Sequence, residues 1–278
     1  MLSSKIGNLI FLYLLIIQQA LSECVALILF MAGCLLFNDE LFTFNFANFN
    51  NSIINDYFAF FTKISICFFS TVYFLIIANF LKEQKLVSFE YLLILLFAIL
   101  GLLIMCSSND LLLTYLAIEL SSLAFYVLAS FRKISSYSIE SGIKYFITGA
   151  ISSAFFLLGS SFIYGLTGTI NFSDLQDLFD LSIFHLDSGN FLYEEIDFFY
   201  VLDINQLFSF RFIEFGLTLI LFSLFIKLAL APFHLWSLDV YEGAPTNSTF
   251  FFATITKLSI FVLLARLCYQ SFFNLKDC

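Results

Sequence analysis

The chain has 278 residues, of which 61% are hydrophobic, 20% aromatic and only 12% charged. A soluble domain carries about 25% charged residues, so this composition excludes a soluble globular fold and indicates a protein that lies mostly within a membrane. The formal net charge of -9 excludes a nucleic-acid-binding protein, because no basic stripe is present to neutralise phosphates. The cysteines form no CxxC pair and mostly lie in apolar runs, so we expect neither a disulfide nor a metal site.

The predicted elements are membrane-spanning helices, each of which needs about 20 apolar residues because lipid cannot satisfy unpaired backbone groups. Segment 6–37 is ambiguous, since its middle is polar (Gln18, Gln19, Ser22, Glu23), and it fits one long helix or two short ones. The later candidate spans are 64–81, 91–107, 111–131, 143–166, 212–236 and 246–266. We therefore predict an all-α polytopic transmembrane bundle of about seven or eight spans, folded as a single domain over residues 1–278.

The placement of basic residues predicts the orientation of these helices. Lys82 and Lys85 follow one span, while Arg132 and Lys133 follow the next span but one, so strict alternation places both loops on the cytoplasmic or matrix side. Segment 171–206 then lies outside the bilayer on the opposite side. This segment contains no Lys or Arg and is rich in Asp and Glu. Acidic segments of this kind are most often solvated loops, and a proton-collecting surface is the alternative.

Ionisable residues inside the spans are the candidate functional residues, because each costs roughly 2.5 to 3.5 kcal/mol to insert. Glu119, Lys227 and Lys257 lie roughly 12, 22 and 18 Å from the starts of their predicted helices, near the middle of the bilayer. Such a row could pass protons by changing its charge states, although a buried ion pair that joins helices is the structural alternative. Lys144 lies near a helix start, where it could join the relay, extend its amine to the membrane surface or pair with Glu140.

A proline predicts a break in the helix that carries Lys227. Pro232 has no N–H to donate to the carbonyl of Leu228, and interrupted membrane helices are tolerated where freed groups line a cavity or meet water. His234 lies two turns after Lys227 in a continuous helix, and its proton affinity suits transfer near neutral pH. It is therefore a further relay candidate, with an interfacial histidine bonded to backbone as the alternative.

The sequence around these residues carries a family likeness. Segments 116–133, 138–172 and 225–245 resemble subunit N of proton-pumping NADH:quinone oxidoreductase, respiratory complex I, which is called NADH dehydrogenase subunit 2 in mitochondria. The resemblance implies an antiporter-like fold and a role as a proton-translocating subunit of the membrane arm. It also assigns proton transfer to the residues already selected, namely Glu119, Lys144, Lys227, Lys257 and His234. NADH, flavin, iron–sulfur and quinone sites are expected in other subunits, with no redox cofactor in this chain.

One departure from the family concerns length. Full-length relatives continue into a second half-channel, whereas this sequence stops at Cys278, so we expect a separate chain to carry the missing half; a fragment is the alternative. Other expected partners are the remaining complex I membrane-arm subunits and lipids. Residue usage rich in Phe, with 41 of them, is compatible with an organellar genome, so we expect the mitochondrial inner membrane, with a bacterial plasma membrane as the alternative. A subunit of a sodium/proton antiporter and a purely structural membrane subunit are the competing functions.

Overall fold

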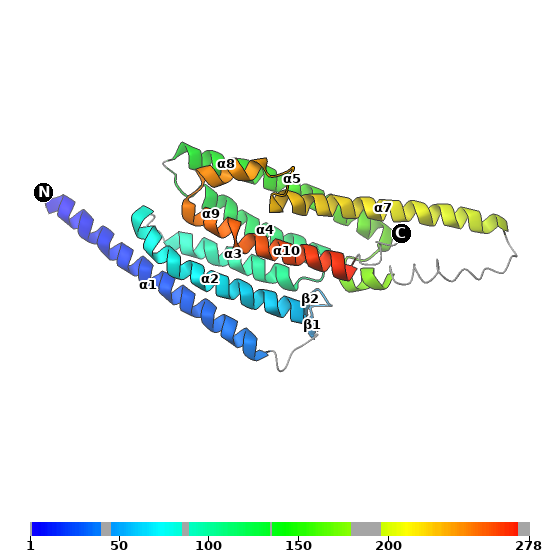
Figure 1. Cartoon of the computed structure of the whole chain (residues 1–278), viewed down its shortest axis with the longest axis horizontal. Helices are drawn as coiled ribbons and strands as arrows, with labels where there is room; N and C mark the ends of the chain where they lie inside the picture. Colours follow the sequence, from blue (N-terminus) through cyan, green and yellow to red (C-terminus); the bar gives the residue numbers. More distant parts are fainter. Residues whose placement is uncertain (1, 40–45, 85–88, 134, 179–195, 272–278) are drawn as a thin grey trace.

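The structure is a computed structural model that describes residues 2–39, 46–84, 89–133, 135–178 and 196–271. Long helices run alternately up and down through one bundle, with a small hairpin at one end (Figure 1). The described elements are α1 (Leu2–Asp39), β1 (Phe46–Asn48), β2 (Ile53–Asn55), α2 (Tyr57–Gln84), α3 (Phe89–Ser107), α4 (Leu111–Ala129), α5 (Ser136–Thr167), α7 (Ile196–Leu228), α8 (Leu235–Gly243), α9 (Thr246–Ala253), α10 (Ile255–Arg266) and the π-helical turn η1 (Leu267–Ser271). The all-α prediction is confirmed.

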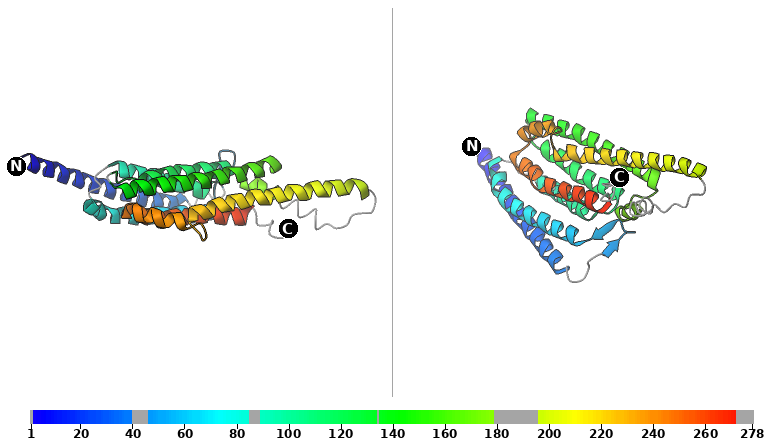
Figure 2. Two further views of the ribbon diagram at one scale, coloured as in Figure 1. Left: turned by 90° about the horizontal axis from the view of Figure 1, so that it is seen from above. Right: turned by 45° about the vertical axis from the view of Figure 1, so that its right-hand side comes forward.

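The ambiguous N-terminal segment is one continuous helix, α1. Its polar middle is accommodated by local hydrogen bonds: the Ser22 hydroxyl donates to the carbonyl of Gln19, and the Gln19 amide donates to Glu23. Ser22 is completely buried where α1 packs along α2, and Figure 2 shows these two helices side by side. These hydrogen bonds satisfy polar groups within the helix, so the polar middle does not divide the segment into two helices.

Six described segments are long and apolar enough to cross a membrane, fewer than the seven or eight predicted. They are Ile16–Phe37, Tyr57–Ile77, Phe89–Ser107, Leu111–Ala129, Ser136–Thr167 and Thr246–Tyr269. Helix α7 is not among them, although it packs along α5 in the bundle. The part of α7 whose side chains are described carries Arg211, Glu214 and Lys227, and each charge makes insertion costlier.

Helix α5 begins earlier than its apolar run predicts. It starts at Ser136 because the side chain of Ser135 accepts a hydrogen bond from the backbone N–H of Ser138, which caps the helix. It ends where Gly168 adopts a left-handed conformation with φ of 73°. The polar first turn is invisible to a search for apolar residues, so the predicted start at 143 was too late.

The helix predicted over 212–236 is interrupted, as expected from Pro232. Helix α7 ends at Leu228, Ala229 has a positive φ of 55°, and α8 begins at Leu235. Figure 1 places this break part-way along α5 rather than at an end of the bundle. The helix predicted over 246–266 is also distorted, at Thr254 between α9 and α10.

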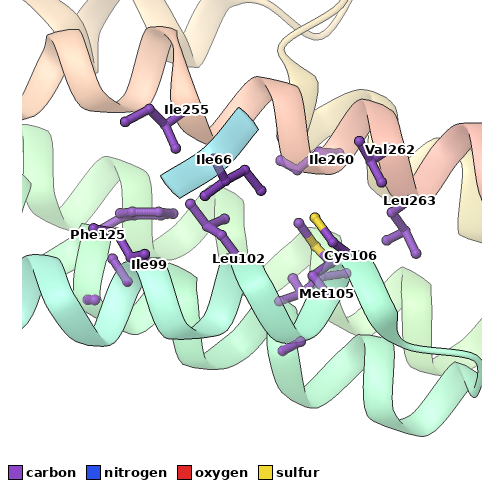
Figure 3. Packing of buried hydrophobic residues seen from close by; sticks show 14 of the residues in the cluster. Ile66, Ile99, Leu102, Met105, Cys106, Phe125, Ile255, Ile260, Val262 and Leu263 are labelled. Atoms are coloured by element: carbon purple, nitrogen blue, oxygen red, sulfur yellow. The ribbon is translucent and has the colours of Figure 1, made fainter. Parts of the chain in front are cut away.

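The core lies where α2, α3, α4 and α10 meet, and Figure 3 shows it from close by. Leu102 of α3, Ile66 of α2, Phe125 of α4 and Leu263 of α10 are each no more than 4% exposed. Exposed large apolar side chains lie on the outward faces of the helices, where a bilayer would receive them.

The β1–β2 hairpin was not predicted from the sequence. Its turn contains positive φ angles at Phe49, Asn50 and Asn51, a conformation that asparagine tolerates better than most residues. The backbone N–H of Asn109 donates to the carbonyl of Ser52, so the hairpin closes over the α3–α4 connection. The α4–α5 connection, with Arg132 and Lys133, lies at the other end of the bundle (Figure 1).

Only part of the acidic segment 171–206 is described. Residues 172–178 are helical, and α7 begins at Ile196 rather than Phe212, so residues 196–206 belong to a helix rather than a loop. Residues 179–195 lie outside the described part, and with them four of its acidic residues: Asp180, Asp187, Glu194 and Glu195. The location of this segment outside the bilayer stays a prediction.

Candidate functional site: a cavity with two lysines

Glu119 lies near the middle of α4, on the face that is turned towards α5. Its Oε1 atom is buried and makes no hydrogen bond within the described residues. Tyr115, Ser122 and Tyr126 occupy the same face of α4, at i−4, i+3 and i+7. The Ser122 hydroxyl donates to the backbone carbonyl of Glu119 at 3.1 Å, so it does not pair the carboxylate.

Lys227 occupies the last turn of α7, directly before the break. The negative end of the helix dipole favours a cation at that position. The carboxylate of Glu119 acts electrostatically on the Lys227 ammonium, but no ion pair joins the two side chains in the described structure. The two groups are therefore close enough to bias each other's charge and too far apart to neutralise each other directly.

Lys257 of α10 binds the backbone at the broken end of α7. Its Nζ atom donates to the backbone carbonyl of Lys227 at 2.9 Å. The ring of Trp236, from α8, lies 5.6 Å from the same ammonium and donates its indole N–H to the carbonyl of Ile226 at 2.9 Å. The expected break thus exposes backbone carbonyls next to Lys227, and side chains from α8 and α10 bind them.

A cavity of about 30 Å³ lies between the helices beside the broken end of α7. That is room for roughly two water molecules. Both Lys227 and Lys257 line it. Hydroxyl groups supply most of the other polar lining: Ser121, Ser122, Tyr145, Thr148, Ser152, Tyr241 and Thr256. The rest of the lining is mostly apolar. The structure therefore brings together, in one cavity, two lysines that lie 30 residues apart in the sequence.

Lys144 lies outside this cavity, near the start of α5. Its Nζ atom is 2.8 Å from a carboxylate oxygen of Glu140 and 2.8 Å from one of Asp239, and its side chain is 43% exposed. The predicted pair with Glu140 is confirmed. Asp239 was missed, because no local sequence pattern relates α5 to α8.

His234 does not join the two lysines. It is exposed, it precedes the first residue of α8, and its side chain caps no backbone group there. The prediction that it shares a helical face with Lys227 was wrong, because the chain leaves the helix between these two residues. Within the described residues, no cluster of His, Cys, Asp and Glu side chains could bind a metal ion.

Comparison with known proteins agrees with this architecture. Residues 108–276 match the family described as NADH:quinone oxidoreductase/Mrp antiporter, transmembrane. The chain belongs to this family. The match begins before α4 and includes Glu119, Lys144, Lys227 and Lys257.

Named relatives and solved structures place the chain within this family. It is 36% identical over 249 residues to NADH-quinone oxidoreductase subunit N of Pelagibacter ubique, which covers 90% of this chain and 47% of that protein. It is 34% identical over 227 residues to NADH-ubiquinone oxidoreductase chain 2 of Marchantia polymorpha, covering 81% and 42%. A chain of respiratory complex I from Thermus thermophilus superimposes with a TM-score of 0.64 at 26% identity, covering 92% and 52%. This chain spans about half the length of the curated relatives that it matches.

Proposed function

We propose that this chain is a proton-translocating membrane-arm subunit of an NADH:quinone oxidoreductase, and that it contributes proton transfer but no redox chemistry. The observation that carries the proposal is the cavity shared by Lys227 and Lys257, with Glu119 acting electrostatically on Lys227. These groups lie on α4, α7 and α10, and the segments Leu111–Ala129 and Thr246–Tyr269, which carry Glu119 and Lys257, are apolar enough to cross a membrane. Charged side chains within a membrane usually serve transport.

The proposed transfer uses the charge states of these residues. Lys227 and Lys257 exchange a proton across the cavity through water that its hydroxyl groups bind. A proton on Glu119 removes the negative charge that stabilises the Lys227 ammonium, so it favours release of the Lys227 proton. The broken end of α7 lets Lys227 reach the cavity while its backbone carbonyl stays bound to Lys257.

Replacement of Glu119 tests this function. Glu119→Gln removes the negative charge with little change of shape, so we expect proton pumping per NADH oxidised to fall at least several-fold in the assembled complex. Glu214→Gln, on the exposed face of α7, is the matched control and should pump normally. Normal pumping by an assembled Glu119→Gln variant would refute the role of Glu119.

We propose that the partners are the other membrane-arm subunits, surrounding lipid and a separate chain that supplies the remaining half. The mitochondrial inner membrane is the proposed location, with a bacterial plasma membrane as the alternative, because relatives of both kinds match. A native gel stained for NADH oxidation, with mass spectrometry of the active band, should show this chain together with the second polypeptide.

The family description also names Mrp antiporters, which makes a subunit of a sodium/proton antiporter the second candidate. That function requires ion exchange without NADH. Purified vesicles that exchange sodium for protons in the absence of NADH would favour the antiporter, whereas pumping that requires NADH favours the oxidoreductase. If the active particle lacks any chain with the second half, a purely structural subunit becomes the better explanation.

A further inference from the structure

Tyr126 presents a second buried polar atom without a hydrogen bond on the Glu119 face of α4. The residue is only 8% exposed, and its hydroxyl makes no hydrogen bond of good geometry within the described residues. The hydroxyl nevertheless lies close enough to Ser122 and Glu119 to interact with both. Buried polar atoms without partners are uncommon in native proteins, so two on one face, Glu119 Oε1 and Tyr126 Oη, require a shared explanation.

The position of the Tyr126 hydroxyl depends on a glycine in the neighbouring helix. A Cβ atom added to Gly149 of α5 would lie 1.8 Å from Tyr126 Oη and 2.6 Å from Tyr126 Cζ, so only glycine leaves this space free. The Tyr126 ring is held edge-on by Tyr145 at 5.0 Å and by Phe146 at 5.5 Å. Gly149 and Tyr145 also line the two-lysine cavity, so the hydroxyl is fixed at the border of that cavity.

Helix α5 continues this polar surface towards Lys144. Lys144, Thr148 and Ser152 are spaced at i, i+4 and i+8, which places them on one face of the helix. Thr148 and Ser152 line the cavity, and the Thr148 hydroxyl donates to the carbonyl of Lys144 at 3.0 Å. Tyr126 thus lies between Glu119, roughly 10 Å along α4, and the hydroxyl-bearing side chains that share a face of α5 with Lys144.

We propose that the Tyr126 hydroxyl, together with Ser122 and cavity water, orients the Glu119 carboxyl group and conducts protons between Glu119 and the Lys144 end of the bundle. In each transfer the hydroxyl accepts a hydrogen-bonded proton on one side and gives its own proton to the next oxygen on the other, so the tyrosine is left unchanged. The inference rests on the proposed function. It adds the hydroxyl groups of Tyr126 and Ser122 to the charged residues that were proposed to transfer protons.

The decisive variant is Tyr126→Phe in the assembled complex, because it removes one oxygen and keeps the ring contacts. We expect proton pumping per NADH oxidised to fall at least threefold. We also expect a shift of the infrared carbonyl band that Glu119→Gln abolishes, a change that a purely structural tyrosine would not cause. Tyr164→Phe, at a tyrosine 55% exposed on α5, is the control and should change neither measurement.

A second variant, Gly149→Ala, displaces the hydroxyl while keeping it present, and we expect it to reproduce both effects. If Tyr126→Phe fails to assemble, Ser122→Ala removes a neighbouring oxygen and decides the question by the same two measurements. Normal pumping or an unchanged Glu119 band in these variants, with Glu119→Gln still defective, overturns the inference and leaves the proposed function standing. Normal pumping by Glu119→Gln as well overturns both.

Discussion

At the scale of single residues, the site is built around two backbone carbonyls at the broken end of α7. Lys257 and Trp236 bind the carbonyls of Lys227 and Ile226, so the groups that hold the break in place also lie at the two-lysine cavity. A buried carbonyl without a partner costs about 1 to 3 kcal/mol. Structural support and proposed proton transfer therefore depend on the same lysine.

Replacing Lys257 by Met tests how much its hydrogen bond to the Lys227 carbonyl stabilises the protein. Methionine has a similar length but cannot donate to the Lys227 carbonyl, so we expect the detergent-solubilised complex to melt at a lower temperature, with a loss of about 1 to 3 kcal/mol. Lys133→Met, at an exposed position, should melt like the wild type. An unchanged melting temperature for Lys257→Met would show that water replaces the lysine without cost.

A second residue-scale prediction concerns Arg266, at the end of α10. Its side chain is only 2% exposed, and its guanidinium donates to the carbonyl of Ser108 and lies 3.4 Å from a carboxylate oxygen of Asp56. We expect Arg266→Leu to destabilise the protein by about 2 kcal/mol, because it leaves that carbonyl unpaired and removes the partner of Asp56.

Asp56→Asn should cost less than Arg266→Leu, since the Asp56 side chain is 29% exposed and water can replace the lost partner. Thermal melting of both variants measures the difference. Equal destabilisation by the two variants would contradict the assignment of the larger share to the Ser108 carbonyl.

At the scale of elements, α5 and α7 lie close together at two glycines. A Cβ atom on Gly159 would lie 2.5 Å from the carbonyl oxygen of Gly216, and one on Gly216 would lie 2.9 Å from the carbonyl oxygen of Gly159. Small residues let membrane helices pack backbone to backbone. This contact fixes α7, and with it Lys227, against α5.

Gly159→Ala should therefore separate the two helices. We expect a destabilisation of about 1 to 3 kcal/mol and reduced assembly, because the atom opposite is backbone and cannot move aside. Gly165→Ala, on the same helix with nothing within 4 Å of the added Cβ, is the control and should be neutral or slightly stabilising. Native-gel yield and melting temperature together test this pair, and equal behaviour of the two variants would contradict the close contact.

At the scale of the whole molecule, the two ends of the bundle differ in chemistry. The α4–α5 connection carries Arg132 and Lys133, whereas the hairpin lies at the opposite end (Figure 1). The basic end is expected to face the cytoplasm or matrix. The first acidic residues of segment 171–206, Asp174 and Asp177, follow soon after Phe172, whose backbone N–H donates to the carbonyl of Asn109 beside the hairpin.

Cysteine labelling tests this orientation. In a chain without its native cysteines, Lys133→Cys should react with an impermeant thiol reagent only from the cytoplasmic or matrix side. Asn50→Cys, in the exposed hairpin turn, should react only from the opposite side. Reaction of both positions from one side would contradict the alternating path of the helices.

The sequence by itself determined the features that depend on local chemistry. Apolar runs predicted the helices, Pro232 predicted the interruption beside Lys227, and i,i+4 spacing predicted the pair of Lys144 with Glu140. Polar residues within a helix or in its first turn misled this reasoning, as in α1 and at the start of α5, because local hydrogen bonds satisfy groups that a search for apolar residues counts as breaks.

Only the tertiary structure decided which distant groups meet. It paired Lys144 with Asp239 across 95 residues, brought Lys257 to the Lys227 carbonyl, and separated His234 from the lysines by ending α7 at Leu228. It also placed the Tyr126 hydroxyl against Gly149 of the neighbouring helix. Sequence spacing gives the face on which a side chain lies within one helix, whereas contacts between helices depend on their packing and on where each backbone breaks.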